Sequence, residues 1–375
     1  MSARFLTVVL ERAFNMRDGF GREIDYMRIS VIDSCNLNCY YCNPCDNNEH
    51  CHALNILSVK EVLCIVRAAT RLGIKHFRLT GGEPLLHPQL DEMVLQIKKI
   101  PGVSSVSLTT NAVLLAQHAK WLKEAGIDSI NVSLDTIDAS EYERITKKPL
   151  LEEVKHGINA AIECGIRVKI NVVLTPQTDV VALTRYVAKK GTDIRFIEMM
   201  PVGEGHTNGV EPYKKVIGTL SKLYGEPCRI NTEKTKEINS ENDKRKIPDN
   251  GPAEYYIFPE LGIRVGLIQA IHGKFCDTCN RIRVTADGRL MPCLGSSVTM
   301  DLVPDSCEFT DDLEKDFVIV QALKAAIKAK PGCHNFNDNA VTYTKTTETK
   351  TVETKTTELK AAEVNAARNM SRIGG

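Results

Sequence analysis

The chain has 375 residues, and its 43% hydrophobic and 25% charged content is that of an ordinary globular protein with room for one large core or two domains. The 48 basic and 47 acidic residues nearly cancel, so the overall charge favours neither nucleic acid nor a membrane surface as a partner. Any polyanionic ligand must therefore meet a local cluster of positive charge. The sequence carries neither an apolar run of about 18 residues nor a signal peptide with a cleavage site, which predicts a cytoplasmic protein.

Repeated strand and helix patterns fill the region from about residue 24 to residue 200. Helical patterns separate six short β-rich runs, which are DYMRISVI, KHFRLT, VSSVSLTT, DSINVSLD, RVKINVVL and TDIRFIEM. One helix is predicted to begin at Ser58, which fits a capping box with Glu61, and to end at Gly73. Alternating strands and helices predict right-handed βαβ units and a parallel sheet. Six units are too few for a closed eight-stranded barrel, so we predict an incomplete (βα)6 barrel of the α/β class, a partial TIM barrel with ligands at the carboxyl ends of its strands.

The rest of the chain divides into smaller pieces. A polar, turn-rich stretch from Asn231 to Pro252 predicts a long loop, and a compact segment with more strands and cysteines follows it. Three copies of TKT[TV]E from Thr344 to Glu358 cannot bury a core and predict a solvated linker. We therefore expect an N-terminal extension at 1–21, the partial barrel at 22–240, a smaller cysteine-bearing segment at 241–340 and a flexible tail at 341–375.

The sequence CNLNCYYC places Cys35, Cys39 and Cys42 in one loop directly after the first predicted strand. Clustered cysteines in a chain without an export signal favour metal ligation or redox chemistry over disulfides. A 4Fe-4S cluster normally takes four thiolates, so three would leave one iron for a ligand from outside the protein. A zinc site, unrelated buried thiols, or an electron-carrying cluster with Cys45 as fourth ligand are the alternatives, although the spacing differs from the ferredoxin pattern.

A second set of cysteines lies in FCDTCNRIRVTADGRLMPC, where Cys276, Cys279 and Cys293 have the spacing C-x2-C-x13-C. These residues could be three ligands of a structural zinc, which His272 would complete. The alternative is a second 4Fe-4S cluster with one open iron, facing the first across the mouth of the barrel.

The other cysteines carry less information. Cys45, His50, Cys51 and His52 are expected either in a loop over the active site or in a small metal site. Cys64 and Cys164 fall on helical patterns and are expected in the core, whereas Cys228, Cys307 and Cys333 fit no pattern.

Basic residues recur at positions that should face the barrel interior. They are Arg28, Arg78, Lys169 and Arg195 on the predicted strands, and Arg281 and Arg283 beside the second cysteine pair. A buried arginine without a partner costs about 3 to 5 kcal/mol. We therefore expect an anionic ligand there, although a solvated or salt-bridged side chain is the alternative for each residue.

The loop C-x3-C-x2-C with Tyr41 before its last cysteine, together with GGEP at Gly81–Pro84, resembles the radical S-adenosylmethionine (SAM) superfamily. In that superfamily the open iron binds the amino and carboxylate groups of SAM, which is cleaved to a 5'-deoxyadenosyl radical. Residues 20–335 and the last six residues further resemble the GTP 3',8-cyclase family of molybdenum cofactor biosynthesis. The resemblance rests on FGREIDYMRIS, RLTGGEPLL, NVSLDT, RVKINVVL, RFIEMMPVGEG, FCDTCNRIRVTADGRLMPCL and MSRIGG.

The resemblance implies a radical SAM lyase that takes the C3' hydrogen of GTP and forms 3',8-cyclo-7,8-dihydro-GTP with two 4Fe-4S clusters and SAM as cofactors. The catalytic groups would be these cofactors rather than side chains. By matching motifs, the first cluster is assigned to Cys35, Cys39 and Cys42, and the second to Cys276, Cys279 and Cys293. The SAM contacts are assigned to Tyr41, Gly82, Ser133 and Met200. The GTP contacts are assigned to Arg28, Arg78, Thr109, Lys169, Arg281, Ile282 and Arg283, with Arg195 as a further phosphate ligand and Gly374 and Gly375 as a tail that reaches the active site.

The same resemblance implies GTP as substrate, an electron donor such as flavodoxin or ferredoxin, and a downstream cyclic pyranopterin synthase. It leaves a homodimer open, and it implies no nucleic acid or membrane partner. The sequence departs from the family at Ser34, Asn43 and Ala112, where arginine, methionine and glycine are usual, and in the repeat before its tail. A radical SAM enzyme acting on a peptide and a non-enzymatic zinc or electron-carrier protein remain the rival functions.

Overall fold

The computed structural model describes residues 16–42, 55–201, 209–230, 251–296, 299–302, 312–334 and 336. The TKT[TV]E repeat, the Gly374–Gly375 tail, the cysteine and histidine residues at 45–52, and most of the predicted loop at 231–252 lie outside these residues. The expectations for them stay predictions.

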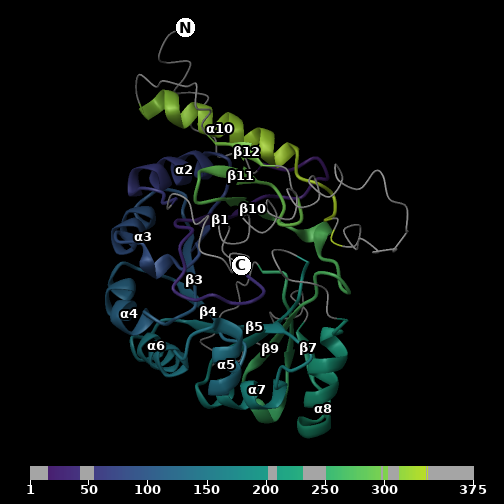
Figure 1. Ribbon diagram of the computed structural model, residues 1–375. Coiled ribbons are helices and arrows are strands. Elements are labelled where there is room, and N and C mark those ends of the chain that lie inside the picture. The colour runs from purple at the N-terminus through teal and green to yellow at the C-terminus, as the bar shows by residue number, and fades with distance from the viewer. Residues whose placement is uncertain are drawn as a thin grey trace, which may run out of the picture.

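Six parallel strands in chain order form the centre of the sheet (Figure 1). Each lies within one of the six predicted runs, which confirms the (βα)6 pattern of the partial barrel. They are β1 (Tyr26–Ser30), β2 (His76–Thr80), β3 (Ser105–Thr110), β4 (Ser129–Ser133), β5 (Val168–Leu174) and β6 (Asp193–Glu198).

Strands from the C-terminal part of the chain extend this sheet at both edges. β9 (Arg264–Ile268) pairs parallel with β6, and β8 (Glu254–Ile257) and β7 (Cys228–Ile230) follow it antiparallel. β10 (Arg281–Val284) pairs parallel with β1, and β11 (Arg289–Met291) and β12 (Met300–Asp301) complete that edge. The described residues thus form one sheet of 12 strands that ends at β12 and β7, which is an open and incomplete barrel.

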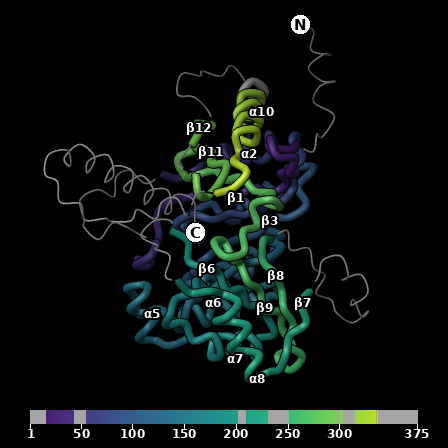
Figure 2. Tube along the Cα trace, turned by 90° about the vertical axis from the view of Figure 1, so that its right-hand side faces the viewer, coloured from purple at the N-terminus to yellow at the C-terminus, as the bar shows by residue number. Residues whose placement is uncertain are grey.

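Helices cover the outer face of the sheet, as Figures 1 and 2 show from two sides. Their bounds are α2 (Val59–Arg71), α3 (Leu90–Lys98), α4 (Leu115–Glu124), α5 (Ala139–Thr146), α6 (Leu151–Glu163), α7 (Val180–Lys189), α8 (Gly218–Tyr224) and α10 (Asp312–Lys328). Short helical turns are η1 (Pro84–Leu86), η2 (Tyr213–Ile217), η3 (Pro259–Leu261) and η4 (Cys276–Thr278). No described helix combines the length and the apolar character needed to cross a membrane.

The predicted capping box at the start of α2 is confirmed. The amide of Glu61 donates to the Ser58 hydroxyl over 3.3 Å, and the amide of Ser58 donates to the Glu61 carboxylate over 2.8 Å. Gly73 follows the helix with a φ of +85°, in the left-handed region that favours glycine. Farther along the chain, α10 packs on α2, where Arg71 forms an ion pair of 3.1 Å with the buried Asp316.

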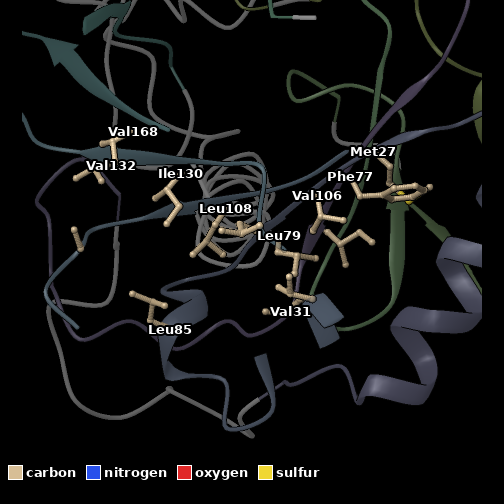
Figure 3. Close-up of a cluster of buried hydrophobic side chains, with 14 of the residues drawn as sticks. Met27, Val31, Phe77, Leu79, Leu85, Val106, Leu108, Ile130, Val132 and Val168 are labelled. Atoms are coloured by element: carbon tan, nitrogen blue, oxygen red, sulfur yellow. The ribbon is translucent and has the colours of Figure 1, made fainter. Parts of the chain in front are cut away.

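Alternation along the strands separates an apolar outer layer from a polar interior. Figure 3 shows Met27, Phe77, Leu79, Val106 and Leu108 among the side chains of the outer layer, and all five are fully buried. Burying a side chain as large as Phe77 contributes about 1.5 to 3 kcal/mol. The outer layer therefore holds the strands in place, and their other face is left free for polar residues.

Candidate active site

One cavity of about 640 Å³ occupies the interior of the partial barrel. Its walls are the inward-facing residues of β1 to β6 and β10, and it reaches all six cysteines that the sequence singled out. We call Cys35, Cys39 and Cys42 the first triad, and Cys276, Cys279 and Cys293 the second triad.

The two triads lie at opposite ends of the strands. The first triad follows the carboxyl end of β1, whereas Cys276 and Cys279 precede β10, whose first residue pairs with Tyr26 at the amino end of β1. The expectation that both sites face each other across the mouth is therefore wrong. It assumed that every ligand lies at carboxyl ends, but β10 enters the sheet from the far side of the cavity.

The GGEP turn holds the loop of the first triad in place. The amide of Gly82 donates to the carbonyl of Ile32 over 2.7 Å, and that of Glu83 donates to the carbonyl of Ser34 over 2.8 Å. A Cβ atom at Gly81 would lie 2.5 Å from the Ile32 carbonyl, and one at Gly82 would collide with the carbonyl of Ser34. The glycines are thus needed for the close approach of two chain segments, besides any ligand.

Glu83 connects this turn to the next strand. Its carboxylate accepts from the Thr110 hydroxyl over 2.6 Å and from the Asn111 amide over 2.7 Å. Burial raises the pKa of Glu83 to about 7, although these hydrogen bonds oppose the shift. The Asn111 side chain in turn donates to Asn36 over 2.7 Å and approaches the Cys35 sulfur at 3.7 Å, so the network reaches the first triad.

Tyr41 is anchored by Asp135, a residue that the sequence reasoning missed. The Tyr41 hydroxyl donates to the Asp135 carboxylate, which also accepts from the amide of Val173 over 2.7 Å. Burial raises the pKa of Asp135 to about 6. The aspartate thereby ties the cysteine loop to the end of β5.

The spacing of the thiols fits iron-sulfur clusters better than single ions. Two thiolates on one tetrahedral zinc, with bonds of about 2.3 Å, lie roughly 3.8 Å apart. Among the described residues, neither triad has all three sulfur atoms within 4.8 Å of one another. Each triad is therefore too wide for one ion, whereas a cluster binds each thiolate through a different iron.

Two buried cations, Arg22 and Lys330, hold the second triad in position. The Arg22 guanidinium donates to the Cys276 carbonyl over 2.7 Å, and the Lys330 ammonium donates to the carbonyl of Pro292, next to Cys293, over 2.9 Å. Burial would raise the pKa of the Cys279 thiol, but Lys330 and other neighbouring donors lower it.

The alternative of a zinc site completed by His272 finds no support among the described residues, because their one group of close ligand atoms does not include His272. His272 hydrogen-bonds to the buried Glu198 instead. Cys333 and His334 lie near the triad, and they form with Cys276 a group whose ligand atoms are all within 4.8 Å of one another. No pattern in the sequence indicates a role for Cys333, because its position depends on the path of the chain after α10.

Basic side chains line the cavity between the triads, as expected from the sequence. The six predicted ones are Arg28, Arg78, Lys169, Arg195, Arg281 and Arg283, and Arg167 and Lys330 line the cavity as well. Arg28 lies opposite Arg78 on one side and Arg283 on the other. Burial and Arg283 hold the pKa of Arg28 well below its usual range, and burial and Arg281 lower that of Arg283 to about 10. A polyanionic ligand would relieve this repulsion.

Tyr26 lies among these cations and was missed by the sequence reasoning. Its hydroxyl accepts a hydrogen bond from Arg78, and the Arg281 guanidinium lies 5.9 Å from its ring centroid. Burial would raise the pKa of Tyr26, but Arg78, Arg28 and Arg281 lower it overall. The signal in the sequence was its place two residues before Arg28, on the same face of β1.

The other predicted contact residues are mostly brought together. Gly82, Ser133, Met200 and Thr109 line the cavity with Tyr41. Ile282 differs, because its side chain is 1% exposed and packs in the core on the other face of β10. Any contact that Ile282 makes with a ligand must go through its backbone.

Comparisons with known proteins agree with this arrangement. Residues 29–182 match the family model of the radical SAM superfamily, and residues 192–336 match that of Molybdenum Cofactor Synthesis C. The fold and the first triad thus define the chain as a radical SAM enzyme.

Curated relatives identify the family to which the chain belongs within the radical SAM superfamily. The GTP 3',8-cyclase of Clostridium perfringens (strain SM101 / Type A) is 35% identical over 324 residues, covering 86% of this chain and 95% of the relative. The GTP 3',8-cyclase of Pelotomaculum thermopropionicum is 36% identical over 324 residues, covering 85% of this chain and 95% of the relative. The chain belongs to the GTP 3',8-cyclase family. A solved structure of Streptococcus suis SuiB bound to S-adenosylmethionine is 16% identical, and the match covers 80% of this chain and 65% of that chain with a TM-score of 0.49.

Proposed function

We propose that the protein is a GTP 3',8-cyclase that catalyses the first step of molybdenum cofactor biosynthesis. It uses the 5'-deoxyadenosyl radical derived from SAM to take the C3' hydrogen of GTP, and the C3' radical then adds to guanine C8. One electron from the electron donor and one proton convert the resulting aminyl radical to 3',8-cyclo-7,8-dihydro-GTP. The observation that carries the proposal is one cavity with a cysteine triad at each end and a wall that includes the six predicted cationic side chains. The names of the curated relatives support it.

The carboxyl ends of the strands form the SAM site. Cys35, Cys39 and Cys42 would hold the first 4Fe-4S cluster, which together with SAM supplies the one-electron chemistry that generates the radical. Gly82, Ser133 and Met200 line the cavity beside the triad, where Asp135 orients Tyr41. These residues bind and position SAM, and none of them takes part in the chemistry.

The cationic wall forms the nucleotide site. Guanidinium groups bind phosphate in a bidentate manner, and Arg28, Arg78 and Arg283 lie side by side on neighbouring strands. Thr109 and Lys169 add a hydroxyl and an ammonium group, and Arg195 a further charge. Because one particular ribose hydrogen must face the radical, fixing the triphosphate is the main task of these side chains.

The second triad would hold the second cluster at the amino end of the strands. Cys276, Cys279 and Cys293 supply three thiolates, which leaves one iron for the guanine base. Arg281 and the backbone of Ile282 begin β10, one residue after Cys279, and are placed for contacts with the same nucleotide. The Gly374–Gly375 tail belongs to this proposal as a further contact.

Two partners follow from the proposed reaction, and a second copy of the chain is proposed besides them. Radical generation needs an electron donor such as flavodoxin or ferredoxin, and the cyclised product needs a cyclic pyranopterin synthase to rearrange it. A homodimer is the proposed assembly. Pull-down of the cluster-loaded protein with flavodoxin, and sedimentation of the protein alone, test the first and the last of these.

Anaerobic turnover tests the function. The cluster-loaded protein is supplied with SAM, dithionite and GTP, and 5'-deoxyadenosine and the nucleotide product are followed by mass spectrometry. We expect GTP-dependent cleavage of SAM, and transfer of deuterium from C3'-deuterated GTP into 5'-deoxyadenosine. Cleavage that is indifferent to GTP would indicate another substrate, such as a peptide, and absence of cleavage with intact clusters would indicate an electron carrier.

A further inference from the structure

Tyr26 has a fixed place in the cavity wall at the amino end of β1. In the sheet it pairs with Arg281 on β10 and with His76 on β2. The Tyr26 amide donates to the carbonyl of Asn280 over 3.3 Å, and the ring centroids of Tyr26 and His76 lie 6.4 Å apart. Strand pairing on both sides and this ring contact therefore fix the direction in which the phenol projects.

The Tyr26 hydroxyl orients the guanidinium group of Arg78 on the neighbouring strand. It accepts a hydrogen bond from Nε of Arg78. On the other side of the guanidinium, Nη1 donates to the carbonyl of Leu108 over 3.2 Å and to the Thr109 hydroxyl over 3.4 Å. Arg78 is thus held at two of its nitrogen atoms, and one of these two anchors is the hydroxyl of Tyr26.

The ring of Tyr26 holds a second arginine, Arg281, which lies on the strand at its other side. The guanidinium carbon of Arg281 is 5.9 Å from the ring centroid of Tyr26 and 5.8 Å from that of Phe275. Aromatic faces attract cations within about 6 Å. The backbone of Arg281 is fixed as well, because its carbonyl accepts from the Lys330 ammonium over 2.8 Å.

A tyrosine suits this place better than a carboxylate would. Burial would raise the pKa of Tyr26, but Arg78, Arg28 and Arg281 lower it overall, which reflects how close their three charges are to the phenol oxygen. The phenol oxygen and the negative ring face offset the repulsion among these cations. A carboxylate would neutralise an arginine and compete with phosphate for it, whereas the neutral phenol leaves the positive charge available to an anion.

We propose that Tyr26 is a positioning residue of the nucleotide site, which holds Arg78 and Arg281 in the arrangement that binds GTP. The inference rests on the proposed function, because it takes these two arginines as GTP contacts. Tyr26 acts through the arginines, so its effect on the nucleotide depends on their presence.

Calorimetric titration of GTP into the cluster-loaded protein, under anaerobic conditions, tests the inference. Tyr26→Phe removes the hydroxyl and keeps the ring, whereas Tyr26→Leu removes both. Tyr186→Phe and Tyr186→Leu are the matched controls, because the ring of Tyr186 on α7 also lies near a cation, the Lys190 ammonium at 5.7 Å, but is not part of the cavity wall. Thermal unfolding and SAM affinity show whether each variant is folded.

The two Tyr26 variants should bind GTP more weakly to different extents. We expect a loss of about 3- to 10-fold for Tyr26→Phe and of about 10- to 50-fold for Tyr26→Leu. In turnover, the KM for GTP should rise by a similar factor while kcat stays within about twofold, because Tyr26 affects binding and not the radical step. The Tyr186 variants should bind GTP as the unsubstituted protein does, and SAM affinity should be the same in all.

A double-mutant cycle shows whether Tyr26 acts through Arg78. In an Arg78→Met background, Tyr26→Phe should change GTP affinity by less than about twofold, because the hydroxyl no longer has a guanidinium to orient. In a Lys169→Met background, the full effect of Tyr26→Phe should persist, since Lys169 lies on β5, which is not adjacent to β1 in the sheet.

Other outcomes separate this inference from the proposed function. Equal GTP affinity in both Tyr26 variants and the unsubstituted protein would overturn the inference and leave the proposed function standing. An effect of Tyr26→Phe that is equally large with and without Arg78 would also overturn it, since the hydroxyl would then act on the nucleotide itself. Absence of GTP binding by the unsubstituted protein, with both clusters loaded, would contradict the proposed function and this inference with it.

Discussion

The two ends of the barrel place similar sets of thiols in opposite electrostatic surroundings. At the carboxyl end, desolvation raises the pKa of Cys35 to about 12 and that of Cys42 to about 11, and the nearby Glu83 and Asp135 act in the same direction. At the amino end, Lys330 and Arg281 lower the pKa of Cys279 against the effect of burial, although burial raises the pKa of Cys276 there to about 11. The difference suggests a division of labour, with radical generation beside the carboxylates and nucleotide binding beside the cations.

Removing one thiol from each end should separate the two tasks. We expect Cys42→Ala to lower SAM cleavage by more than the roughly 10- to 100-fold typical of changes to residues that support metal ligands. Cys293→Ala should keep the iron of the first cluster and SAM cleavage with dithionite, but lose the cyclised nucleotide. The measurements are iron content, 5'-deoxyadenosine and product by mass spectrometry. Equal loss of SAM cleavage in both variants would contradict the division.

Replacing Arg283 tests whether the cations at the amino end of the barrel bind the nucleotide. Arg283→Met removes a buried guanidinium whose Nη1 has no hydrogen-bond partner among the described residues. If this group binds phosphate, the change should cost about 2 to 5 kcal/mol of GTP binding, as measured by calorimetry.

The same change should stabilise the nucleotide-free protein by about 1 kcal/mol. Burial and Arg281 lower the pKa of Arg283 to about 10, so the folded state disfavours its charge at every pH below that value. Arg289→Met is the control, because Arg289 forms an exposed ion pair of 3.1 Å with Asp301 and should change both quantities little. Unchanged GTP binding in Arg283→Met would remove this residue from the nucleotide site.

The pH dependence of stability in an Asp135 variant tests the carboxyl end of the barrel. The pKa of Asp135 rises from 3.8 to about 6 on folding, so the folded state favours the protonated form, and the associated stability is lost as the pH rises through about 6. Asparagine does not titrate, so Asp135→Asn does not lose this stability as the pH rises. Its side chain can still form hydrogen bonds with the Tyr41 hydroxyl and the Val173 amide. Its stability relative to the unsubstituted protein should therefore increase by about 1 to 3 kcal/mol between about pH 4 and 7, as measured by urea unfolding of the cluster-loaded protein.

Asp138→Asn is the matched control for that measurement. Asp138 caps α5 by accepting from the Glu141 amide over 2.8 Å, and asparagine caps a helix equally well. A parallel pH profile for both variants would show that Asp135 is not the group responsible.

The sequence predicted the strands well and the second site poorly, for physical reasons. The six runs were recognisable because β-branched residues alternate with polar ones within each strand, which is a local signal. The place of Cys276 at the amino end depends on β10 pairing with β1, some 250 residues earlier in the chain, and no local pattern records it.

The glycines of GGEP, at the first site, also show that a local pattern does not record contacts between distant chain segments. Their position at a strand end was evident, and a ligand was the expected reason for them. The structure adds a second reason, because Gly81 and Gly82 pack against the carbonyls of Ile32 and Ser34. A contact between chain segments some 50 residues apart produces the same sequence signal as a contact with a ligand.

Ala112 tests how much strain the carboxyl end tolerates. It follows Asn111, which contacts the first triad, and it has a φ of +65° where glycine is usual in the family. The left-handed conformation costs a residue with a Cβ atom about 1 to 2 kcal/mol, whereas losing the buried methyl group costs roughly 0.8 kcal/mol. Ala112→Gly should therefore be neutral or stabilising by up to about 1 kcal/mol.

Ala119→Gly is the matched control, since Ala119 is equally buried but lies inside α4, where glycine costs about 1 kcal/mol before any loss of packing. Urea unfolding should place the two variants about 1 to 2 kcal/mol apart, with Ala112→Gly the more stable. SAM affinity should stay unchanged in Ala112→Gly, because the glycine can keep the same backbone and hence the same Asn111 contacts. Equal destabilisation by both substitutions would mean that the surrounding contacts, and not strain, determine the conformation at Ala112.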